Sequence, residues 1–544
     1  MTEIKTKKEL ETALYSAADA LRGKMDANEY KNYLLGIVFY KYLSDKMLYY
    51  VGELIGDPNA NLEENQKLYE DNYDDKELQK ELKRTFTYSI GRYHTFTYIL
   101  NEIIELARKD NKINTFQISD LADAFNDIES TSDNFRGLFD DVDLYSRVLG
   151  DNAQQQADTI ANVMKAIGNL EIVKTSSDTL GDAYEYLIRQ FASETGKKSG
   201  EFYTPQKVSE LLTKLSLLGK EYPDGLVVYD PAMGSGSLLL NFGKFIKNFG
   251  GKPEQVIYFG QEINFSTHRL AKMNMILHGV DFGNQHLRRG NTLSADWPPI
   301  SRTMFDAVVM NPPYSLKWPA NKGFLQDPRF SPYGVLPPKS KADYAFLLHG
   351  FYHLKNTGTM AIVLPHGVLF RGAAEGKIRK KLLEDGSIDA VIGLPANLFY
   401  NTSIPTVILV LKKDKEDRSV MFIDASKGFE KKKNQNELRE EDIQKILETY
   451  EKREEVKRYA HLAKYDEIEE NDFNLNIPRY VDTFVPEPPV DLKKVASDLH
   501  ETNVEIEKNQ KELVGMLKEL TSDDQDVMSG LDAIIKELEG ELHD

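Results

Sequence analysis

The 544-residue sequence contains no cysteine, and this absence excludes disulfides, thiolate metal ligands and a cysteine nucleophile. Histidine is also scarce, with 10 residues in the chain, so a structural zinc site is not expected and we assign no metal. No apolar run approaches the ~18 residues that span a bilayer. Residues 1–10 are mostly polar, unlike a signal peptide. We therefore expect a cytoplasmic protein that does not enter a membrane.

Positive charge is in deficit, because 68 Lys and Arg residues stand against 86 Asp and Glu residues and leave a net charge of −18. Proteins that bind DNA unaided usually carry a basic surplus, since released counterions supply much of the affinity. A role on nucleic acid would therefore require a local basic face or a partner. The acidity is uneven: residues 491–544 hold 15 acidic and six basic residues, a net charge of −9 in a tenth of the length.

The chain is longer than the roughly 100 to 200 residues of an ordinary domain, and changes in its pattern of apolar residues divide it into three parts. Residues 1–172 place apolar side chains three and four apart with few strand signals, which predicts an all-helical N-terminal domain. The second part is residues 173–480. Up to about residue 413 it alternates short β-branched runs with helical stretches, which predicts βαβ units around a parallel sheet, and a charged helical stretch follows at about 437–459. The expected strands are residues 226–229, 256–259, 305–310, 359–364, 388–392 and 406–411.

Residues 481–544 form the third part, a helical and partly coiled-coil-like tail that follows a proline-rich break. Its apolar residues recur every seven positions, at Leu492, Leu499, Ile506, Leu513 and Leu520. Such a stripe on a charged helix indicates packing on one partner helix, either in another chain or in the same chain. We expect this tail to dock subunits.

The first chemical motif is a glycine-rich turn after the strand that ends in Asp230. Gly234 and Gly236 permit a ligand to approach the backbone, and the helix that follows offers unpaired N–H groups. Leu239 stands where the dinucleotide pattern has its third glycine. A carboxylate at the strand end would repel a pyrophosphate but suits an ammonium or hydroxyl groups. Glu262, after the next strand, can accept from both hydroxyls of a ribose.

The decisive motif is Asn311-Pro312-Pro313-Tyr314, directly after the expected strand 305–310. The two prolines remove backbone donors and stiffen the turn, so that the Asn311 side-chain oxygen and the Pro312 carbonyl can face a substrate. Two acceptors suit the two N–H groups of an exocyclic purine amine, which is otherwise a poor nucleophile. Tyr314 can stack on the base. A base held in this way must first leave the duplex.

These motifs together resemble the S-adenosylmethionine-dependent DNA adenine-N6 methyltransferases, and the chain as a whole resembles the modification subunit of type I restriction-modification systems. The segment Gly-Glu-Phe-Tyr-Thr-Pro-Gln at 200–206 precedes the two turns, which is the order of the gamma arrangement. Residues 341–346, 364–370, 398–405 and 471–480 also fit, the last being typical of type I subunits. The resemblance implies a Rossmann-like methyltransferase α/β sheet, an all-helical N-terminal domain and a helical C-terminal tail.

The resemblance also implies roles for individual residues. Those expected around the methionine part of the cofactor S-adenosylmethionine are Glu201, Phe202, Tyr203, Thr204, Pro205, Gln206, Asp230, Ala232, Gly234, Ser235, Gly236 and Ser237. Glu262 would hold the ribose, and Asn291 would lie near the adenine of the cofactor. On the substrate side, the turn of Asn311, Pro312 and Pro313 would bind the target amine. Tyr314 and Phe399, or its neighbour Tyr400, would sandwich the flipped base.

The same resemblance implies partners: a specificity subunit that reads double-stranded DNA, a second copy of this chain, and a restriction subunit that acts as ATP-dependent translocase and nuclease. No base-reading region is evident after residue 411, and no Gly-x4-Gly-Lys-Ser/Thr loop is present, which agrees with this division of labour. Two alternatives stay open. One is a solitary DNA adenine-N6 methyltransferase with its own recognition surface, and the other is a non-catalytic assembly scaffold.

Overall fold

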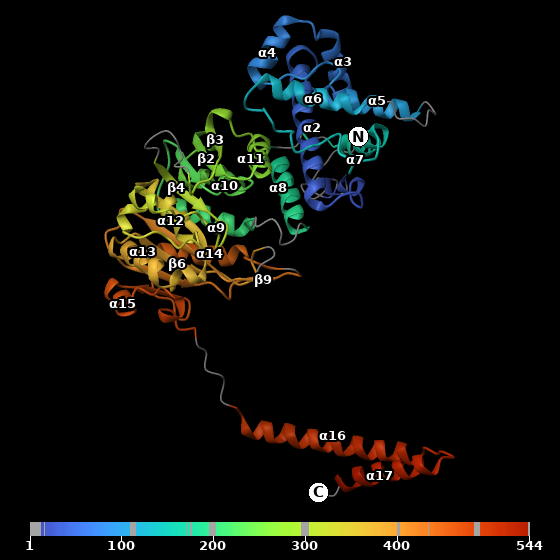
Figure 1. Cartoon of the computed structure of the whole chain (residues 1–544), viewed down its shortest axis with the longest axis vertical. Helices are drawn as coiled ribbons and strands as arrows, with labels where there is room; N and C mark the ends of the chain where they lie inside the picture. Colours follow the sequence, from blue (N-terminus) through green and yellow to red (C-terminus); the bar gives the residue numbers. More distant parts are fainter. Residues whose placement is uncertain are drawn as a thin grey trace. The chain divides into compact units, whose positions relative to one another are not determined.

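A computed structural model describes residues 12, 14–15, 17–108, 116–170, 172–173, 177–194, 203–294, 304–399, 403–433, 435–483 and 490–541. The chain divides into two compact units, Met1–Asp482 and Thr483–Asp544. Figure 1 follows the chain from the helices at its N-terminus, through a sheet with flanking helices, to a terminal pair of helices.

The part of the first unit that precedes the sheet is helical, as the apolar spacing predicts, and its described residues contain no strand. Its α-helices are α2 (Ala27–Ile55), α3 (Leu62–Asn72), α4 (Lys76–Phe86), α5 (Phe96–Arg108), α6 (Ile118–Thr131), α7 (Ala153–Gly168) and α8 (Ser177–Glu194). Helix α2 packs against α3, α5, α7 and α8. Most of its side chains between Tyr33 and Val51 are buried, so α2 is the centre of this helical core.

The rest of the first unit contains a nine-stranded mixed sheet in the order β11-β8-β6-β7-β5-β4-β1-β2-β3. The strands are β1 (Leu226–Asp230), β2 (Val256–Glu262), β3 (Gln285–Arg289), β4 (Phe305–Met310), β5 (Leu354–Pro365), β6 (Ile388–Gly393), β7 (Thr406–Lys412), β8 (Val420–Asp424) and β11 (Ala460–Ala463). A separate pair is formed by β9 (Glu430–Lys431) and β10 (Asn436–Glu437). All six strands expected from the sequence are present.

The expectation of a parallel sheet is wrong for two strands. Strand β7 runs antiparallel to both β5 and β6, and β11 runs antiparallel to β8. The reason is local: β6 and β7 are neighbours separated by residues 394–405, whose described part contains no helix, and a connection without a crossover helix reverses the chain. Strands β1, β2, β4 and β6 therefore all end at one edge, where the segment after β6 also lies.

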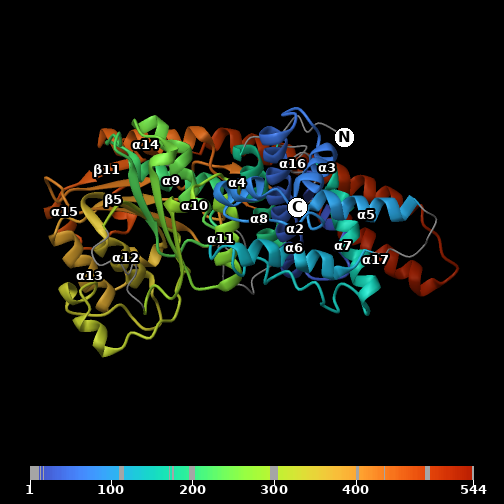
Figure 2. The same ribbon diagram turned by 90° about the horizontal axis from the view of Figure 1, so that it is seen from above.

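Helices cover both faces of the sheet, as Figure 2 shows. On one face lie α9 (Gln206–Leu217), α10 (Ser237–Phe245) and α14 (Glu440–Lys452), and on the other lie α12 (Asp343–Tyr352) and α13 (Ala373–Glu384), each over its own apolar core. Helix α11 (Phe265–Leu277) joins the two parts of the unit. Its Ala271 and Met275 pack into the sheet core, whereas Met273 and Leu277 pack into the helical core.

The second unit consists of α16 (Leu492–Lys518) and α17 (Gln525–Glu541), which pack on each other. Val514 and Ile535 are its buried apolar side chains. The residues spaced seven apart stay exposed, with exposed fractions of 76% at Leu492, 60% at Leu499, 50% at Ile506, 44% at Leu513 and 54% at Leu520. None of the described helices in either unit combines the length and apolar content that crossing a membrane requires.

Candidate active site

A pocket of about 550 Å³ opens at the edge where β1, β2 and β4 end. The carboxyl ends of parallel strands are where α/β sheets bind ligands. Its lining includes the glycine-rich turn after β1, Glu262 at the end of β2, Asn291 after β3, and Asn311 and Pro313 after β4. The sequence motifs indicated each of these residues, although they did not indicate β3 itself. The lining also includes Lys31, Asn32, Leu35 and Ile188 from the helical part, which sequence motifs did not indicate.

Asp230 ends β1 beside the pocket and is almost completely buried. Its Oδ1 accepts a hydrogen bond from the Ala232 N–H at 2.9 Å. Burial, opposed by the Ala232 N–H and aided by the charge of Glu262, raises the pKa of Asp230 to about 8. The carboxyl group is thus costly to ionise unless a cation joins it.

The glycine-rich turn takes backbone conformations that favour glycine, with φ of 55° at Gly234 and 78° at Gly236. A Cβ on Gly234 would meet no atom within 4 Å, so the backbone there faces open space. The sequence motifs did not indicate Gly260, a glycine within β2. A Cβ on Gly260 would lie 2.2 Å from the Met233 sulfur, so glycine in β2 is what lets the turn pack against that strand.

Glu262 ends β2 opposite the same turn. Its Oε2 accepts from the Gly234 N–H at 3.2 Å and its Oε1 accepts from the Asn264 N–H at 2.8 Å. Asn291 follows β3, and its Oδ1 accepts from the Leu293 N–H at 3.0 Å. The turns that carry these residues are joined, because the Thr292 hydroxyl donates to the Pro231 carbonyl at 2.6 Å.

Asn311 stands at the end of β4, largely buried and fixed at both ends of its amide. Its Nδ2 donates to the Thr204 hydroxyl oxygen at 3.0 Å, and its Oδ1 accepts from the Tyr314 hydroxyl at 2.7 Å. The adjacent Tyr203 hydroxyl donates to Ser237 Oγ at 3.2 Å. The segment expected to border the cofactor therefore also orients Asn311.

Tyr314 and Phe399 lie edge to face, with ring centroids 6.1 Å apart and planes at 80°. Burial raises the pKa of Tyr314 well above its ordinary value. Pro312 is buried, and Pro313 lines the pocket. The structure thus brings Phe399, from the segment after β6, to the Asn-Pro-Pro-Tyr turn. Tyr400 lies outside the described residues, as do Glu201 and Phe202.

The remaining predicted residues of the 201–206 segment form the start of α9. Pro205 precedes the helix, and Gln206 is its first residue. The Gln206 side-chain oxygen accepts from Arg189 Nη1 at 2.8 Å, so its amide contacts α8 of the helical part. Gln206 does not line the pocket, whereas Tyr203 does.

A buried polar network behind the pocket was not foreseen from the sequence. Arg329 Nη1 donates to the Thr292 carbonyl and to His349 Nδ1, both at 3.0 Å, and His349 Nε2 lies 2.8 Å from the Tyr229 hydroxyl. Burial lowers the pKa of His349 well below its ordinary value, and the nearby His353 and Arg329 add to this. A neutral His349 held between two partners supports the Asn291-Thr292 turn from behind.

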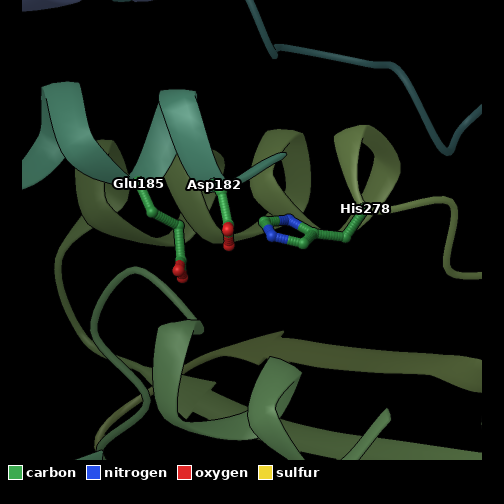
Figure 3. Close-up of side chains that lie close together, drawn as sticks. All are labelled: Asp182, Glu185 and His278. Carbon is green, nitrogen blue, oxygen red and sulfur yellow. The ribbon is translucent and has the colours of Figure 1, made fainter. Parts of the chain in front are cut away.

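Three polar side chains meet where α8 packs on α11 (Figure 3). Asp182 and Glu185 come from α8, and His278 follows α11, with ligand atoms all within 4.8 Å of one another. The His278 Nδ1–H donates to the Asn274 carbonyl at 2.9 Å. The Asn274 amide donates to the Ser235 carbonyl at 3.1 Å. One imidazole and two carboxyl groups thus meet at this interface, and Asn274 links the interface to the glycine-rich turn.

Comparison with known proteins gives consistent matches. Residues 175–487 match the family described as N-6 DNA methylase, and residues 10–167 match the HsdM N-terminal domain. The chain is 36% identical to the type I restriction enzyme MpnII methylase subunit of Mycoplasma pneumoniae, over 94% of this chain and 96% of that protein. It is 31% identical to the MjaVII methylase subunit of Methanocaldococcus jannaschii, over 94% of this chain and 83% of that protein.

Among solved structures, the chain is similar to a type I restriction-modification system methyltransferase subunit from Streptococcus thermophilus. The two share 54% sequence identity and a TM-score of 0.83, and the match covers 88% of this chain and all of the other. The fold expected from the sequence, a methyltransferase sheet with helical regions at both ends of the chain, is thereby confirmed.

Proposed function

Because this chain belongs to the family of type I restriction enzyme methylase subunits, we propose that it transfers a methyl group from S-adenosylmethionine to N6 of an adenine in double-stranded DNA. The observation that carries the proposal is the Asn-Pro-Pro-Tyr turn at the end of β4. There the Asn311 amide is oriented through Thr204, so that its oxygen lies on the side of Tyr314.

The residues of the pocket fit S-adenosylmethionine. The acidic Asp230 and Glu262 suit an ammonium and a pair of ribose hydroxyls, and the open backbone at Gly234 leaves room beside them. Gln261 is buried and lines the pocket, and its Nε2 has no hydrogen-bond partner among the described residues. A buried donor without a partner is costly, so a polar ligand would relieve it.

The bound cofactor would supply a methyl group already activated on a sulfonium sulfur, and the chain would supply position and polarity. Asn311 Oδ1 and the Pro312 carbonyl accept the two N–H groups of the adenine amine, which concentrates the nitrogen lone pair toward the methyl carbon. With the cofactor bound, the methyl group would pass from sulfur to N6, S-adenosylhomocysteine would be the product that leaves, and the methylated amine would release one proton to solvent. The step requires no histidine as a general acid or base, which agrees with the structural role of His349.

The adenine would have to leave the duplex to reach Asn311, since its amine is paired inside the helix. Tyr314 would then stack on the flipped base, with Phe399 on the opposite side. In the structure the Tyr314 hydroxyl bonds to the Asn311 oxygen that would accept the amine. Base entry therefore requires Tyr314 to give up this hydrogen bond, and the adenine amine takes its place.

Sequence reading and assembly belong to partners in this proposal. The exposed stripe on α16 suits a partner helix, and we assign it to subunit docking. The partners are a DNA-specificity subunit, a second copy of this chain and an ATP-dependent restriction subunit. The solitary enzyme is not favoured, because the relatives reported above are named as methylase subunits. The non-catalytic scaffold is also not favoured, because the Asn-Pro-Pro-Tyr turn is intact.

The test is Asn311→Ala in the full chain, assayed together with the specificity subunit. Methyl transfer should fall by at least about 10²- to 10³-fold, the scale on which a lost transition-state hydrogen bond acts. Binding of S-adenosylhomocysteine, measured by calorimetry, should stay close to wild type. Asn59→Ala, in the exposed loop after α2, is the matched control and should methylate normally. Full activity of Asn311→Ala would refute the role of the turn.

A further inference from the structure

The helical part of the first unit forms one wall of the pocket. Lys31 and Leu35 lie four residues apart on α2, so they share one face of the helix, and both line the pocket together with Asn32. Ile188 of α8 lines it as well, three residues after Glu185. The pocket is therefore shared between the helical part and the sheet.

Two sets of contacts place this wall beside the glycine-rich turn. Tyr203 packs against the helical core, and its hydroxyl donates to Ser237 Oγ. On the other side, the Asn274 amide donates both to the Ser235 carbonyl at 3.1 Å and to Glu185 Oε1 of α8 at 3.5 Å. Helices α2 and α8 pack on each other. The wall thus borders the end of the pocket formed by Tyr203 and the turn at 234–237.

Lys31 is half-buried in this wall, and neither the Lys31 nor the Asn32 side chain makes a hydrogen bond or ion pair with any other described residue. The titratable side chains at the turn are both acidic, namely Asp230 and Glu262. Among the described residues that line the pocket, the cationic side chains are Lys31 and Lys317, and Lys317 is exposed beyond the Asn-Pro-Pro-Tyr turn. Lys31 is the cation at the end bordered by the glycine-rich turn.

We propose that Lys31 of the helical part binds the α-carboxylate of the cofactor's methionine group, with the Asn32 amide as a second donor. This inference rests on the proposed function. The amino acid end of the cofactor carries one ammonium and one carboxylate. Asp230 provides the carboxylate that suits the ammonium, and the Lys31 ammonium provides the opposite charge for the carboxylate. A charge-assisted hydrogen bond forms in each case.

The proposal gives the helical part a direct role in binding a small molecule. Because Lys31 comes from a segment about 200 residues before Asp230, the complete cofactor site exists only where α2 and α8 pack against α11 and the sheet. The contact of Asp182, Glu185 and His278 lies at this same packing interface. Helical and catalytic parts would then bind the cofactor as one site.

The experiment compares two nucleosides by calorimetry on the full-length chain. S-adenosylhomocysteine carries the amino acid group, whereas 5′-methylthioadenosine lacks it. Lys31→Gln should weaken S-adenosylhomocysteine by about 10- to 100-fold, as expected when a hydrogen bond to a charged group is lost. The same variant should bind 5′-methylthioadenosine as wild type does, which also shows that the pocket is folded. Lys67→Gln removes an equal charge from the exposed face of α3 and should change neither affinity.

Every other outcome contradicts either the Lys31 contact or the cofactor assignment. Unchanged S-adenosylhomocysteine affinity in Lys31→Gln overturns the inference. If, in addition, the affinity of the assembled complex for DNA and its salt dependence fall, Lys31 contacts a phosphate instead. Equal weakening of both nucleosides overturns the carboxylate contact in favour of a general effect on the pocket. A wild-type chain that binds neither nucleoside overturns the cofactor assignment of the proposed function itself.

Discussion

Helices α2 and α16 are the longest in the chain, at 29 and 27 residues, and the molecule uses them in opposite ways. Helix α2 buries most of its length among the other helices of the first unit, and Lys31 near its start reaches the pocket. Helix α16 buries one residue, Val514, and exposes its apolar stripe. A long helix thus serves in one case to complete a site within the chain and in the other to offer a surface outward.

The difference has a physical basis in the sequences of the two helices. Helix α2 is apolar or aromatic around most of its circumference between Tyr33 and Val51, so that it must be surrounded by other helices. Helix α16 has a narrow stripe on an otherwise charged surface, which one neighbouring helix suffices to cover. In this account, chemistry belongs to the first unit and assembly to the second, and the two should be separable by mutation.

The largest separable effect is expected from the stripe on α16. Leu499→Asp combined with Ile506→Asp places two charges at the centre of the proposed docking face, where burial against a partner would be prohibitive. Methylation that depends on the specificity subunit should fall more than about 100-fold, with co-purification of the subunits lost. S-adenosylhomocysteine affinity should not change. The control variant, Ser497→Asp with His500→Asp, changes residues of the same helix that lie away from the stripe and should assemble normally. If the variant with Leu499→Asp and Ile506→Asp still bound the other subunits, the assignment of the stripe would be contradicted.

A smaller effect is expected within the first unit at Tyr314. Replacing it with alanine removes the ring that stacks on the flipped base, a contact worth about 1–3 kcal/mol, or about 5- to 150-fold in kcat/KM for DNA. Tyr314→Phe keeps the ring and removes only the hydroxyl that bonds to Asn311, so its kcat/KM should stay within severalfold of wild type. Steady-state methylation assays distinguish the two. Equal losses in both variants would assign the role to the hydroxyl and not to the ring.

A pH dependence follows from Asp230, whose pKa burial raises from 3.8 to about 8. The protonated carboxyl predominates at pH 7, whereas pairing with an ammonium requires the carboxylate. S-adenosylhomocysteine affinity should therefore rise about fivefold from pH 7 to pH 8 and then level off. Asp230→Asn should remove this rise. In the ligand-free chain the sign is opposite for stability: the folded state retains a proton that the unfolded state releases, so Asp230 lowers stability as pH rises from about 4 to about 8.

The smallest effect, no change at all, is expected from chelation. Methyl transfer as described here requires no metal, so EDTA should leave the methylation rate of the complex unchanged. A loss that added divalent cation restores would direct attention to Asp182, Glu185 and His278, and His278→Ala would then show whether the cation binds there. Such a result would contradict the interpretation of that group as a structural contact between helices.

Local signals in the sequence identified much of the fold and of the site. Apolar runs marked β1, β2 and β4. Because parallel strands end at the same edge, Glu262 and Asn311 line one pocket and Asp230 directly precedes the lining residues Pro231 and Ala232. Strand β3 was missed because its sequence, Gln285 to Arg289, is polar and lies at the edge of the sheet. The reversal of β7 was missed because an apolar strand has no directional signal in its composition.

Contacts between distant segments could not be predicted from motifs. The bond of Asn311 to Thr204 joins residues 107 apart, and the support of Thr292 by Arg329 depends on a loop that carries no recognisable motif. In the sequence, nothing distinguishes Lys31 from a solvated lysine near the start of a helix. Only the packing of α2 and α8 on α11 brings it to the pocket. Such positions depend on tertiary packing, which the local pattern of residues does not encode.

The separation of chemistry from recognition is tested most directly by methylating double-stranded DNA with this chain, in the presence and in the absence of the specificity subunit, and mapping N6-methyladenine along the product. The account predicts N6-methyladenine at one recurring sequence when both subunits are present, and essentially none when the chain acts alone or carries Asn311→Ala. Equally rapid methylation of a defined sequence by the chain alone would contradict it.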